Sequence, residues 1–411
     1  MNKSITLSQI TTSIFDGKHG DCENLKGSGL YFISVKDLSD YNINYYNARE
    51  ITPNDFEQNY KRTNLEEGDT IYANTGDTIG KSIFVKNNKL VSKTSFQKSI
   101  AVLKPNINII EPRYLYYLMK YETPRLRKVA TGSGQKNLLL STMRDFKVTI
   151  HDRKRQKQIC SLLGLLDDKI EINNKINDEL ENMAKTIYDY WFLQFEFPNE
   201  EGKPYKSSGG KMVWNEELKR EIPEGWDLCT IEDISICHDA KRIPLSNKER
   251  EQMKGDIPYY GATGIMDYVN QYIFDGDYVL IAEDGSIMND DGSPILQRIS
   301  GKTWVNNHAH ILEPIDNYSC KLLMMILKDI PVVTIKTGSI QMKINQKNLN
   351  KVKIVSVPNN LKNRINRILN DIDKKILLNK KENQELTSLR DFLLPLLMNG
   401  QVGFKEDKAE G

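Results

Sequence analysis

The feature that most constrains this chain is an internal repeat. The pentapeptide at residues 131–135, Thr-Gly-Ser-Gly-Gln, returns at residues 337–341 as Thr-Gly-Ser-Ile-Gln, 206 positions later. The same offset then holds, without a gap, for a series of identical residues. They are Lys147/Lys353, Ile159/Ile365, Leu163/Leu369, Asp167/Asp373, Asn173/Asn379, Asn177/Asn383 and Leu180/Leu386. Chance does not hold one register over about fifty residues, so the chain carries two copies of one structural unit.

Each copy begins with a body in which short apolar runs alternate with Gly, Asn and Asp. Such runs predict β-strands separated by turns. In the first body we expect strands at 30–35, 70–73, 82–85 and 99–103, with one helix at 112–121. In the second body we expect strands at 278–282 and 309–312, with a helix at 320–328. Strands and helices mixed in this way predict an α+β fold for both bodies.

Each body is followed by a segment in which apolar residues recur every three or four positions. The positions are Ile159, Leu163, Leu166, Ile170, Ile176, Leu180, Met183 and Ile187, then Ile365, Leu369, Ile372, Ile376, Leu386 and Leu389. This period predicts two long helices, which pack on each other as a coiled coil because neither can bury its stripe alone. Asn173, Asn177, Asn379 and Asn383 interrupt the stripes. We expect them to pair the helices and set their register, the alternative being exposed polar positions.

These patterns divide the chain into six segments. They are a first body at 1–152, a first spacer helix at 153–195, a linker at 196–225, a second body at 226–357, a second spacer helix at 358–400 and a tail at 401–411. The linker is rich in Gly, Pro and Ser, which predicts little regular structure.

Cysteine usage and hydropathy indicate the compartment. The five cysteines are scattered and form no C-x-x-C pair, so we expect neither a disulfide framework nor a zinc ribbon. No signal-peptide pattern follows Met1, and no apolar run of about 18 residues occurs. We therefore expect a cytoplasmic protein that does not enter a membrane.

Motifs for catalysis are missing from the sequence. It contains neither a phosphate-binding loop nor a glycine fingerprint for a dinucleotide. The nuclease-like E-x-K triplets at 201–203 and 406–408 fall in polar linker and tail. His308 and His310 share one side of a strand, but no further ligands of a metal site stand near them in the sequence. We predict no catalytic residue, no metal and no cofactor in this chain.

The charge distribution points to a polyanion. The net charge is only +2, yet residues 125–157 hold ten bases against two acids, and residues 336–367 hold eight bases and no acid. Two such stretches fit DNA touched at two places, although solvated lysine-rich faces would look the same. Gln can pair with adenine, and Lys can reach guanine or phosphate, from the polar loops of both bodies. The candidate DNA-binding residues are Thr75, Lys81, Ser133, Gln135, Lys136, Asn137, Tyr260, Thr263, Asn307, His308, Ser339, Gln341 and Lys343.

At this point the sequence resembles the specificity subunits of type I restriction-modification systems. The likeness covers essentially the whole chain and is weaker in the first body. The segments that carry it are PYKSSGGKM at 204–212, IPEGW at 222–226, YYGATG at 259–264, YVLIAEDG at 278–285, NNHAH at 306–310 and LLPLLMNGQ at 393–401.

The resemblance implies a fold, a function and partners. The fold would be two target-recognition domains joined by two long antiparallel coiled-coil helices with pseudo-twofold symmetry. Each domain would read one half of a bipartite, asymmetric site on double-stranded DNA. The helices would set the spacer and dock two methyltransferase subunits. Those subunits would use adenosylmethionine, and translocase-nuclease subunits would use ATP and magnesium, so this chain would itself be non-catalytic.

Three alternatives remain open from the sequence. The nearest is the recognition subunit of a type IIB-like restriction system, which differs only in its partners. A stand-alone nuclease is a second, against which the missing motifs argue. A coiled-coil scaffold that binds no DNA is a third, and it would require both basic stretches to be incidental.

Overall fold

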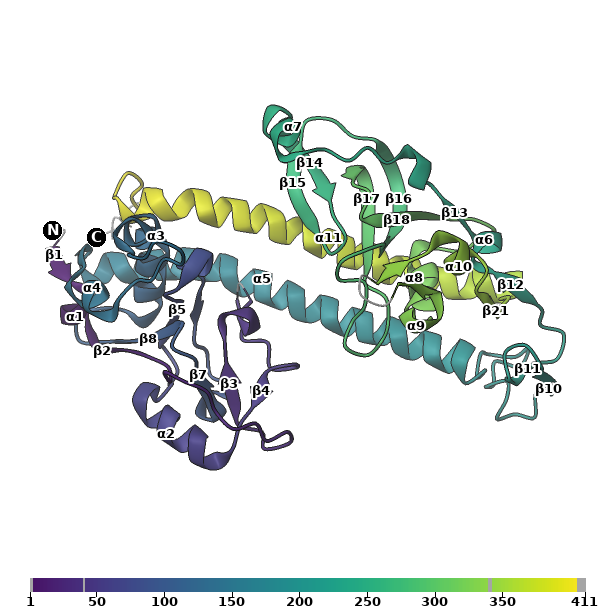
Figure 1. Cartoon of the computed structure of the whole chain (residues 1–411), viewed down its shortest axis with the longest axis horizontal. Coiled ribbons are helices and arrows are strands. Elements are labelled where there is room, and N and C mark those ends of the chain that lie inside the picture. The colour runs from purple at the N-terminus through teal and green to yellow at the C-terminus, as the bar shows by residue number, and fades with distance from the viewer. Residues whose placement is uncertain (1–2, 40, 339–341, 405–411) are drawn as a thin grey trace, which may run out of the picture. The chain divides into compact units, whose positions relative to one another are not determined.

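The computed structural model describes residues 3–39, 41–338 and 342–404. It divides into two compact units. Unit 1 comprises residues 1–175 and 380–411, and unit 2 comprises residues 176–379. Each unit contains one globular body and a portion of each long helix (Figure 1). In the described part of the chain, no helix is long and apolar enough to cross a membrane.

The body of unit 1 holds two small sheets. The four-stranded sheet has the order β2-β8-β5-β6 and is antiparallel, whereas in the β4-β3-β7 sheet strands β3 and β7 run parallel. The strands are β2 (Thr11–Asp16), β3 (Tyr31–Ile33), β4 (Arg49–Glu50), β5 (Thr70–Ala73), β6 (Ser82–Phe84), β7 (Thr94–Phe96) and β8 (Ile100–Pro105). A separate antiparallel pair, β1 (Lys3–Thr6) with β9 (Lys147–Ile150), ties the start of the body to its end.

Four α-helices lie in the described part of this body. They are α1 (Leu7–Ile10), α2 (Pro53–Thr63), α3 (Pro112–Val129) and α4 (Leu140–Asp145). The apolar face of α3 shares one buried cluster with Leu163 from the first long helix and Leu397 from the second. Removing each such side chain from water stabilises the fold by roughly 1.5–3 kcal/mol. The cluster therefore attaches the body to both helices of its own unit.

The helices of this body correct two sequence predictions. Only one helix was expected, at 112–121, but α2 forms as well, because the Thr52 side chain accepts a hydrogen bond from the Asp55 amide and Pro53 occupies the first turn. Helix α3 also continues through Pro124 to Val129. Beyond the proline, Leu126 is fully buried, so tertiary packing offsets the lost backbone hydrogen bond.

The body of unit 2 is built on one six-stranded sheet with the order β13-β18-β16-β17-β14-β15. Its strands are β13 (Ser235–Cys237), β14 (Lys254–Tyr260), β15 (Ile265–Val269), β16 (Phe274–Ala282), β17 (Leu296–Val305) and β18 (Ala309–Pro314). Outside the sheet lie the antiparallel pairs β12 (Leu228–Thr230) with β21 (Lys353–Val355) and β19 (Lys336–Thr337) with β20 (Lys343–Ile344). The sequence predicted parts of β16 and β18 but missed β14, β15 and β17, whose polar residues hide the alternation.

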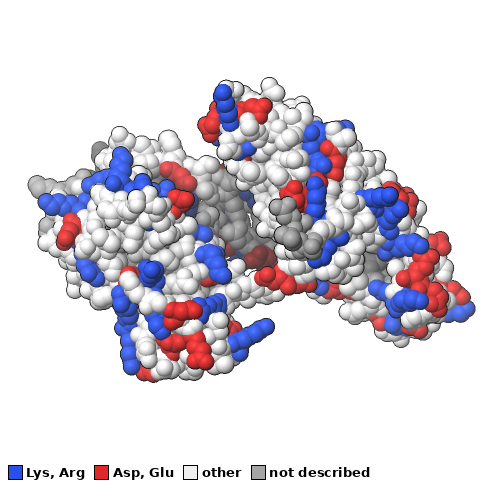
Figure 2. Space-filling view, in the orientation of Figure 1, with Lys and Arg blue, Asp and Glu red and all other residues white. Residues whose placement is uncertain are grey.

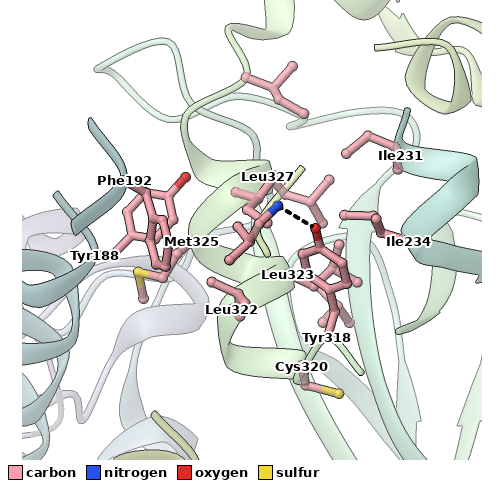
Figure 3. Close-up of a cluster of buried hydrophobic side chains, with 14 of the residues drawn as sticks. Tyr188, Phe192, Ile231, Ile234, Tyr318, Cys320, Leu322, Leu323, Met325 and Leu327 are labelled. Atoms are coloured by element: carbon pink, nitrogen blue, oxygen red, sulfur yellow. Dashed lines mark hydrogen bonds between the residues drawn. The ribbon is translucent and has the colours of Figure 1, made fainter. Parts of the chain in front are cut away.

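The helices of this body include α8 (Cys320–Lys328), which has the predicted bounds. The others are α6 (Ile231–Ile234), α7 (Asn247–Gln252), α9 (Val332–Ile335) and α10 (Gln346–Asn350). In the core, Tyr188 and Phe192 lie on one side of α8, and α6 lies on the other (Figure 3). Tyr318 is also buried there, and its hydroxyl accepts a hydrogen bond from the Val357 amide.

The segment between the first long helix and the second body is more ordered than its composition predicts. It contains an antiparallel hairpin, β10 (Met212–Asn215) with β11 (Arg220–Pro223). Phe197 stacks on both Tyr205 and Trp226, with ring centroids 4.6 and 5.0 Å apart. This aromatic stack supplies apolar contacts that a glycine-rich segment was not expected to make.

The long helices are α5 (Arg153–Tyr188), extended by a π-helical turn at Asp189–Leu193, and α11 (Asn359–Met398). In unit 1, Asp167 contacts Arg390 and Asn173 contacts Asn383, so the numbers rise on one helix as they fall on the other. The helices are therefore antiparallel. In unit 2 the contacts of Asn177 with Asn379 and of Trp191 with Arg364 show the same direction.

All four asparagines that interrupt the stripes make contacts between the two helices. Asn173 donates to Asn383 at 2.9 Å and to Glu382 at 2.7 Å in unit 1. Asn379 donates to Asn177 at 2.8 Å in unit 2. The offset of 206 residues converts the first of these asparagine pairs into the second, so the repeat in the sequence is also a repeat of contacts.

Some apolar positions assigned to the stripe lie elsewhere. Ile176, Met183 and Leu389 are exposed, whereas Asn173, Asn177 and Asn379 are buried. The buried surface between the helices therefore turns polar at the asparagines, whereas these three apolar residues face solvent. A helix with apolar residues on two sides leaves one side available for a further partner.

Candidate functional site

One group of metal-ligating side chains converges among the described residues, and it does not fit a metal. Cys237, Asp239 and His310 approach within 4.8 Å of one another. The Nδ1 atom of His310 is 2.5 Å from Asp239, and its Nε2 atom is 3.0 Å from the carbonyl oxygen of Ile344. Because both ring nitrogens are engaged, the histidine has no free nitrogen for an ion.

The repeated pentapeptide lies in a defined place in unit 1. The loop at 131–137 is fully exposed and returns on itself through backbone hydrogen bonds between Thr131 and Asn137. It is fastened to the end of β5, because the Leu138 amide donates to the Asn74 carbonyl at 2.8 Å and Thr75 bridges to Asn137. We call residues 74–76 and 131–138 the loop junction of unit 1.

Unit 2 contains the same junction. The Ile344 amide donates to the Glu283 carbonyl at 2.8 Å, and Asp284 bridges to Lys343. Strands β19 and β20 pair Thr337 with Lys343, as Thr131 pairs with Asn137 in unit 1. We call residues 283–285, 337–338 and 342–344 the loop junction of unit 2.

Further bonds match between the two junctions. The Asn74 amide donates to Ser99 in unit 1, and the Glu283 amide donates to His308 in unit 2, each at the end of a paired strand. Gly76 and Gly285 both have a left-handed backbone, with φ of 68° and 73°. A side chain at either position would be strained, so glycine sets the turn that leads away from both junctions.

The side chains on this shared frame differ. In unit 1 the junction presents the hydroxyl of Thr75 and the amides of Gln135 and Asn137, with Lys136 beside them. In unit 2 the corresponding bridge joins an acid, Asp284, to a base, Lys343. One frame thus carries a mostly uncharged set in unit 1 and an ionic set in unit 2.

An ion-pair network supports the junction of unit 2. Glu283 is buried and receives Lys343 at 2.7 Å and Arg242 at 2.6 Å, one cation on each carboxylate oxygen. Burial acts to raise the pKa of Glu283, but the hydrogen bonds from Lys343 and Arg242 outweigh it and hold this pKa below its usual value. His308 bonds the Oδ1 atom of Asp284 at 2.6 Å. Lys343 and Arg242 thus balance the charge of Glu283, and His308 orients the carboxylate of Asp284.

The other candidate DNA-binding residues that the sequence predicts, where the structure describes them, lie around these junctions. Lys81 is half-buried, and its carbonyl accepts from Ala73 beside the unit 1 junction. Ser133 is exposed within that junction. In unit 2, Tyr260 accepts from the Asn306 amide, which precedes exposed Asn307 and His308, and Thr263 is exposed at the tip between β14 and β15. Ser339 and Gln341 lie outside the described residues.

Many bases of the two basic stretches make contacts within the protein. Arg127 donates to the backbone of Ile79, and Arg144 donates to that of Ile14. Lys362 is buried against Asp316. On the visible face, basic side chains stand among acidic ones (Figure 2). Many of these bases therefore hold the fold together, and sequence counts overstated the charge available to a partner.

Arg242 is the residue that the sequence analysis missed. It bonds Glu283 and the carbonyl of Ala309, and it lies 3.2 Å from Asp239, so it joins three segments at the junction of unit 2. Its sequence signal was weak, since a Lys-Arg pair in a loop has no period. Buried Glu283 was the stronger signal, because a buried carboxylate requires a cation.

The long helices also present repeated apolar residues to solvent. Ile172 and Leu389 are 52% and 45% exposed in unit 1, and their repeat equivalents Leu378 and Met183 are 54% and 53% exposed in unit 2. We call each pair the apolar helix patch of its unit. These exposed apolar positions are therefore part of the repeat.

Comparison with known proteins gives one consistent result. The sequence profile described as "Type I restriction modification DNA specificity domain" matches residues 20–182 and again residues 223–388. The chain is 26% identical over 403 residues to the type I restriction enzyme MjaIX specificity subunit of Methanocaldococcus jannaschii, covering 92% of this chain and 88% of that protein. It is 23% identical over 409 residues to the HindI specificity subunit of Haemophilus influenzae, covering 82% and 87%.

A solved structure shares the fold. The crystal structure of the S subunit of a type I restriction-modification system from M. genitalium matches with a TM-score of 0.52 at 18% sequence identity. The match covers 97% of this chain and 96% of that one. Both halves of the chain therefore take part in the likeness.

The ionic network predicts a pH dependence for Arg242→Met. Glu283 has a depressed pKa, so its ionised form stabilises the fold above its unfolded-state pKa, and this contribution is lost as pH falls through the folded-state value. Removing Arg242 should lower the free energy of unfolding by about 3 kcal/mol at pH 7. The loss should become progressively smaller in more acidic solution, where Glu283 takes up a proton. Urea unfolding between pH 3 and 8 measures this.

Lys353→Met is the control for that experiment. It removes an exposed ion pair with Glu217 in the same unit, in which both side chains are about half exposed. Its stability profile should follow the wild-type profile. A loss in Arg242→Met that is equal at pH 3 and pH 7 would contradict the role assigned to Glu283.

Proposed function

Because the chain belongs to the family of type I restriction modification DNA specificity domains, we propose that it reads DNA sequence within a type I restriction-modification complex. The observation that carries this proposal is the loop junction, which occurs once in each unit on the same backbone frame. Polar side chains on a fixed frame are what base recognition requires. The two junctions differ chemically, which fits two different half-sites.

In this proposal the antiparallel helices determine the spacer between the half-sites. Their register is constrained by the asparagine contacts, Asn173 with Asn383 and Asn177 with Asn379. A buried asparagine pair costs stability if it slips out of register, because each amide would then lose its partner. The spacer length is therefore built into the helix pair rather than into the bodies.

The apolar helix patches support a second part of the proposal, that two identical methyltransferase subunits dock on this chain. Each patch consists of one exposed residue of α5 and one exposed residue of α11 within one unit: Ile172 and Leu389, and Met183 and Leu378. Equivalent patches suit two copies of one partner. Burying an exposed Leu or Ile at such an interface contributes roughly 1.5–3 kcal/mol.

Catalysis is assigned to the partners in this proposal. The methyltransferase subunits would bind adenosylmethionine and methylate a flipped adenine. Translocase-nuclease subunits would use ATP and magnesium. The residues of this chain would select and position the DNA, in the cytoplasm, for those reactions.

Genome-wide mapping of adenine methylation tests the recognition role. The host should be compared with a strain that lacks only this gene and retains its methyltransferase genes. We expect one split motif, two short blocks with a fixed gap, to lose its methylation in the deletion strain. Reintroducing the gene should restore that motif, and an unchanged methylation map would contradict the proposed function.

Substitutions in the patches test the docking. Ile172→Ser with Leu389→Ser alters the patch of unit 1 alone, so the chain should bind one methyltransferase subunit instead of two. Adding Leu378→Ser and Met183→Ser should abolish binding, as measured by native mass spectrometry. Ile107→Ser is the control, since Ile107 is 64% exposed but lies off both long helices. Retention of two subunits by the fourfold variant would contradict this interface.

A further inference from the structure

The bridge at each loop junction points to a specificity-determining residue pair, an inference that rests on the proposed function. We propose that Thr75 and Asn137 read an A·T base pair in one half-site. Asp284 and Lys343, which occupy the equivalent positions in unit 2, read a G·C base pair in the other half-site. The two half-sites therefore differ at this position because one frame carries two chemistries.

Geometry places the members of each pair beside one another. Each pair forms an isolated antiparallel bridge. Side chains directly opposite across such a bridge have Cβ atoms about 4.5–5.5 Å apart. Asn137 is exposed and Thr75 is half-buried, while the side chains of Asp284 and Lys343 are 35% and 51% exposed. Two neighbouring, accessible side chains can contact both bases of one pair.

The unit 1 pair matches the major-groove edge of A·T. The amide of Asn137 offers one donor and one acceptor, which suit N7 and the N6 amino group of adenine. The hydroxyl of Thr75 can donate to O4 of thymine, and its methyl group suits the thymine methyl. Gln135 stands next to this pair, since a Cβ atom on Gly76 would lie 3.2 Å from the Gln135 Nε2 atom. A second amide is thus available on the same side.

The unit 2 pair matches G·C instead. The ammonium group of Lys343 donates, and guanine presents two acceptors, O6 and N7. The carboxylate of Asp284 accepts, and the N4 amino group of cytosine donates. Lys343 matches A·T less well, because adenine presents the N6 donor where guanine presents the O6 acceptor. The charged pair therefore discriminates by leaving a wrong base pair unmatched.

The ion pairs of the free protein are compatible with this role. Lys343 can turn from Glu283 to the DNA because Arg242 remains on the other oxygen of Glu283, at 2.6 Å. His308 bonds one oxygen of Asp284 at 2.6 Å. A carboxylate has about four acceptor positions, so Asp284 keeps acceptor capacity while His308 fixes its orientation. The cations also reduce the repulsion between these acids and phosphate.

An exchange of the two pairs tests this inference. Thr75→Asp with Asn137→Lys gives unit 1 the unit 2 pair, and Asp284→Thr with Lys343→Asn does the reverse. Adenine methylation is mapped in hosts that carry each variant with the native methyltransferase. We expect one base pair of one half-site to change, from A·T to G·C or from G·C to A·T, while the other half-site stays as in the wild type.

Binding in vitro supplies the quantitative test and guards against misfolding. The purified chain with its methyltransferase is offered duplexes that differ only at that base pair. Lys343→Asn should reduce the preference for G·C about tenfold or more, and Lys343→Arg should retain it. Lys347→Asn, an exposed change on α10 outside the junction, should retain the wild-type motif and the preference for G·C. Melting temperatures identify any variant that is unfolded. If an exchange variant is unfolded, the single Lys343 variants test the inference.

Four outcomes are distinguishable. An altered base at one half-site supports the inference. Lys343→Asn could instead weaken binding to all duplexes alike and reduce the slope of log affinity against log salt concentration by about one. In that case Lys343 contacts phosphate and the inference is wrong. An unchanged motif in both exchange variants overturns it too, with the proposed function intact. If the wild-type complex methylates no split motif, the proposed function itself fails.

Discussion

A buried carboxylate at one repeated position attaches each body to the long helices. In unit 1, Asp167 accepts a hydrogen bond from the Tyr117 hydroxyl at 2.6 Å and one from Arg390 at 2.9 Å. In unit 2 its equivalent, Asp373, receives Arg298 at 2.9 Å. An unpaired buried carboxylate costs several kcal/mol, so each unit has to supply a cation. Arg390 comes from α11, whereas Arg298 comes from β17, so the attachment is kept while its partner differs between the bodies.

The same separation of frame and side chain governs the loop junctions. Backbone hydrogen bonds fix where each loop meets the sheet, and they depend little on side-chain identity. The exposed positions on that frame are then free to vary, as the bridges Thr75–Asn137 and Asp284–Lys343 show. A recognition subunit needs this arrangement, because its specificity can change without a change of fold. The buried network of Glu283 and Arg242 supports the ionic set of unit 2.

Sequence reasoning succeeded where the pattern was repeated. The offset of 206 residues predicted two units, two long helices and contacts between asparagines such as Asn173 and Asn383. It failed where tertiary contacts decide, as in α3, which continues past Pro124. Arg242 lies far in sequence from Glu283, so no local pattern reveals their contact. Residues such as Met183 were wrongly assigned to the buried stripe. A helix with two apolar sides shows the same sequence period as a helix with one buried side.

The central claim is that the two bodies are exchangeable recognition units on the same backbone frame. A chain that carries the first body twice tests this claim most directly. Residues 231–352 are replaced by residues 7–146. These boundaries are equivalent, because the Leu7 amide donates to the Phe146 carbonyl in unit 1 and the Ile231 amide donates to the Val352 carbonyl in unit 2. Ala184→Arg supplies Asp373 with the cation that Arg390 gives Asp167. Asn370→Gly and Lys374→Asp recreate the Gly164 and Asp168 partners of Arg113. Mapping of adenine methylation in a host with this chain should show one half-site present twice in inverted orientation, whereas methylation of the original asymmetric motif would contradict the account.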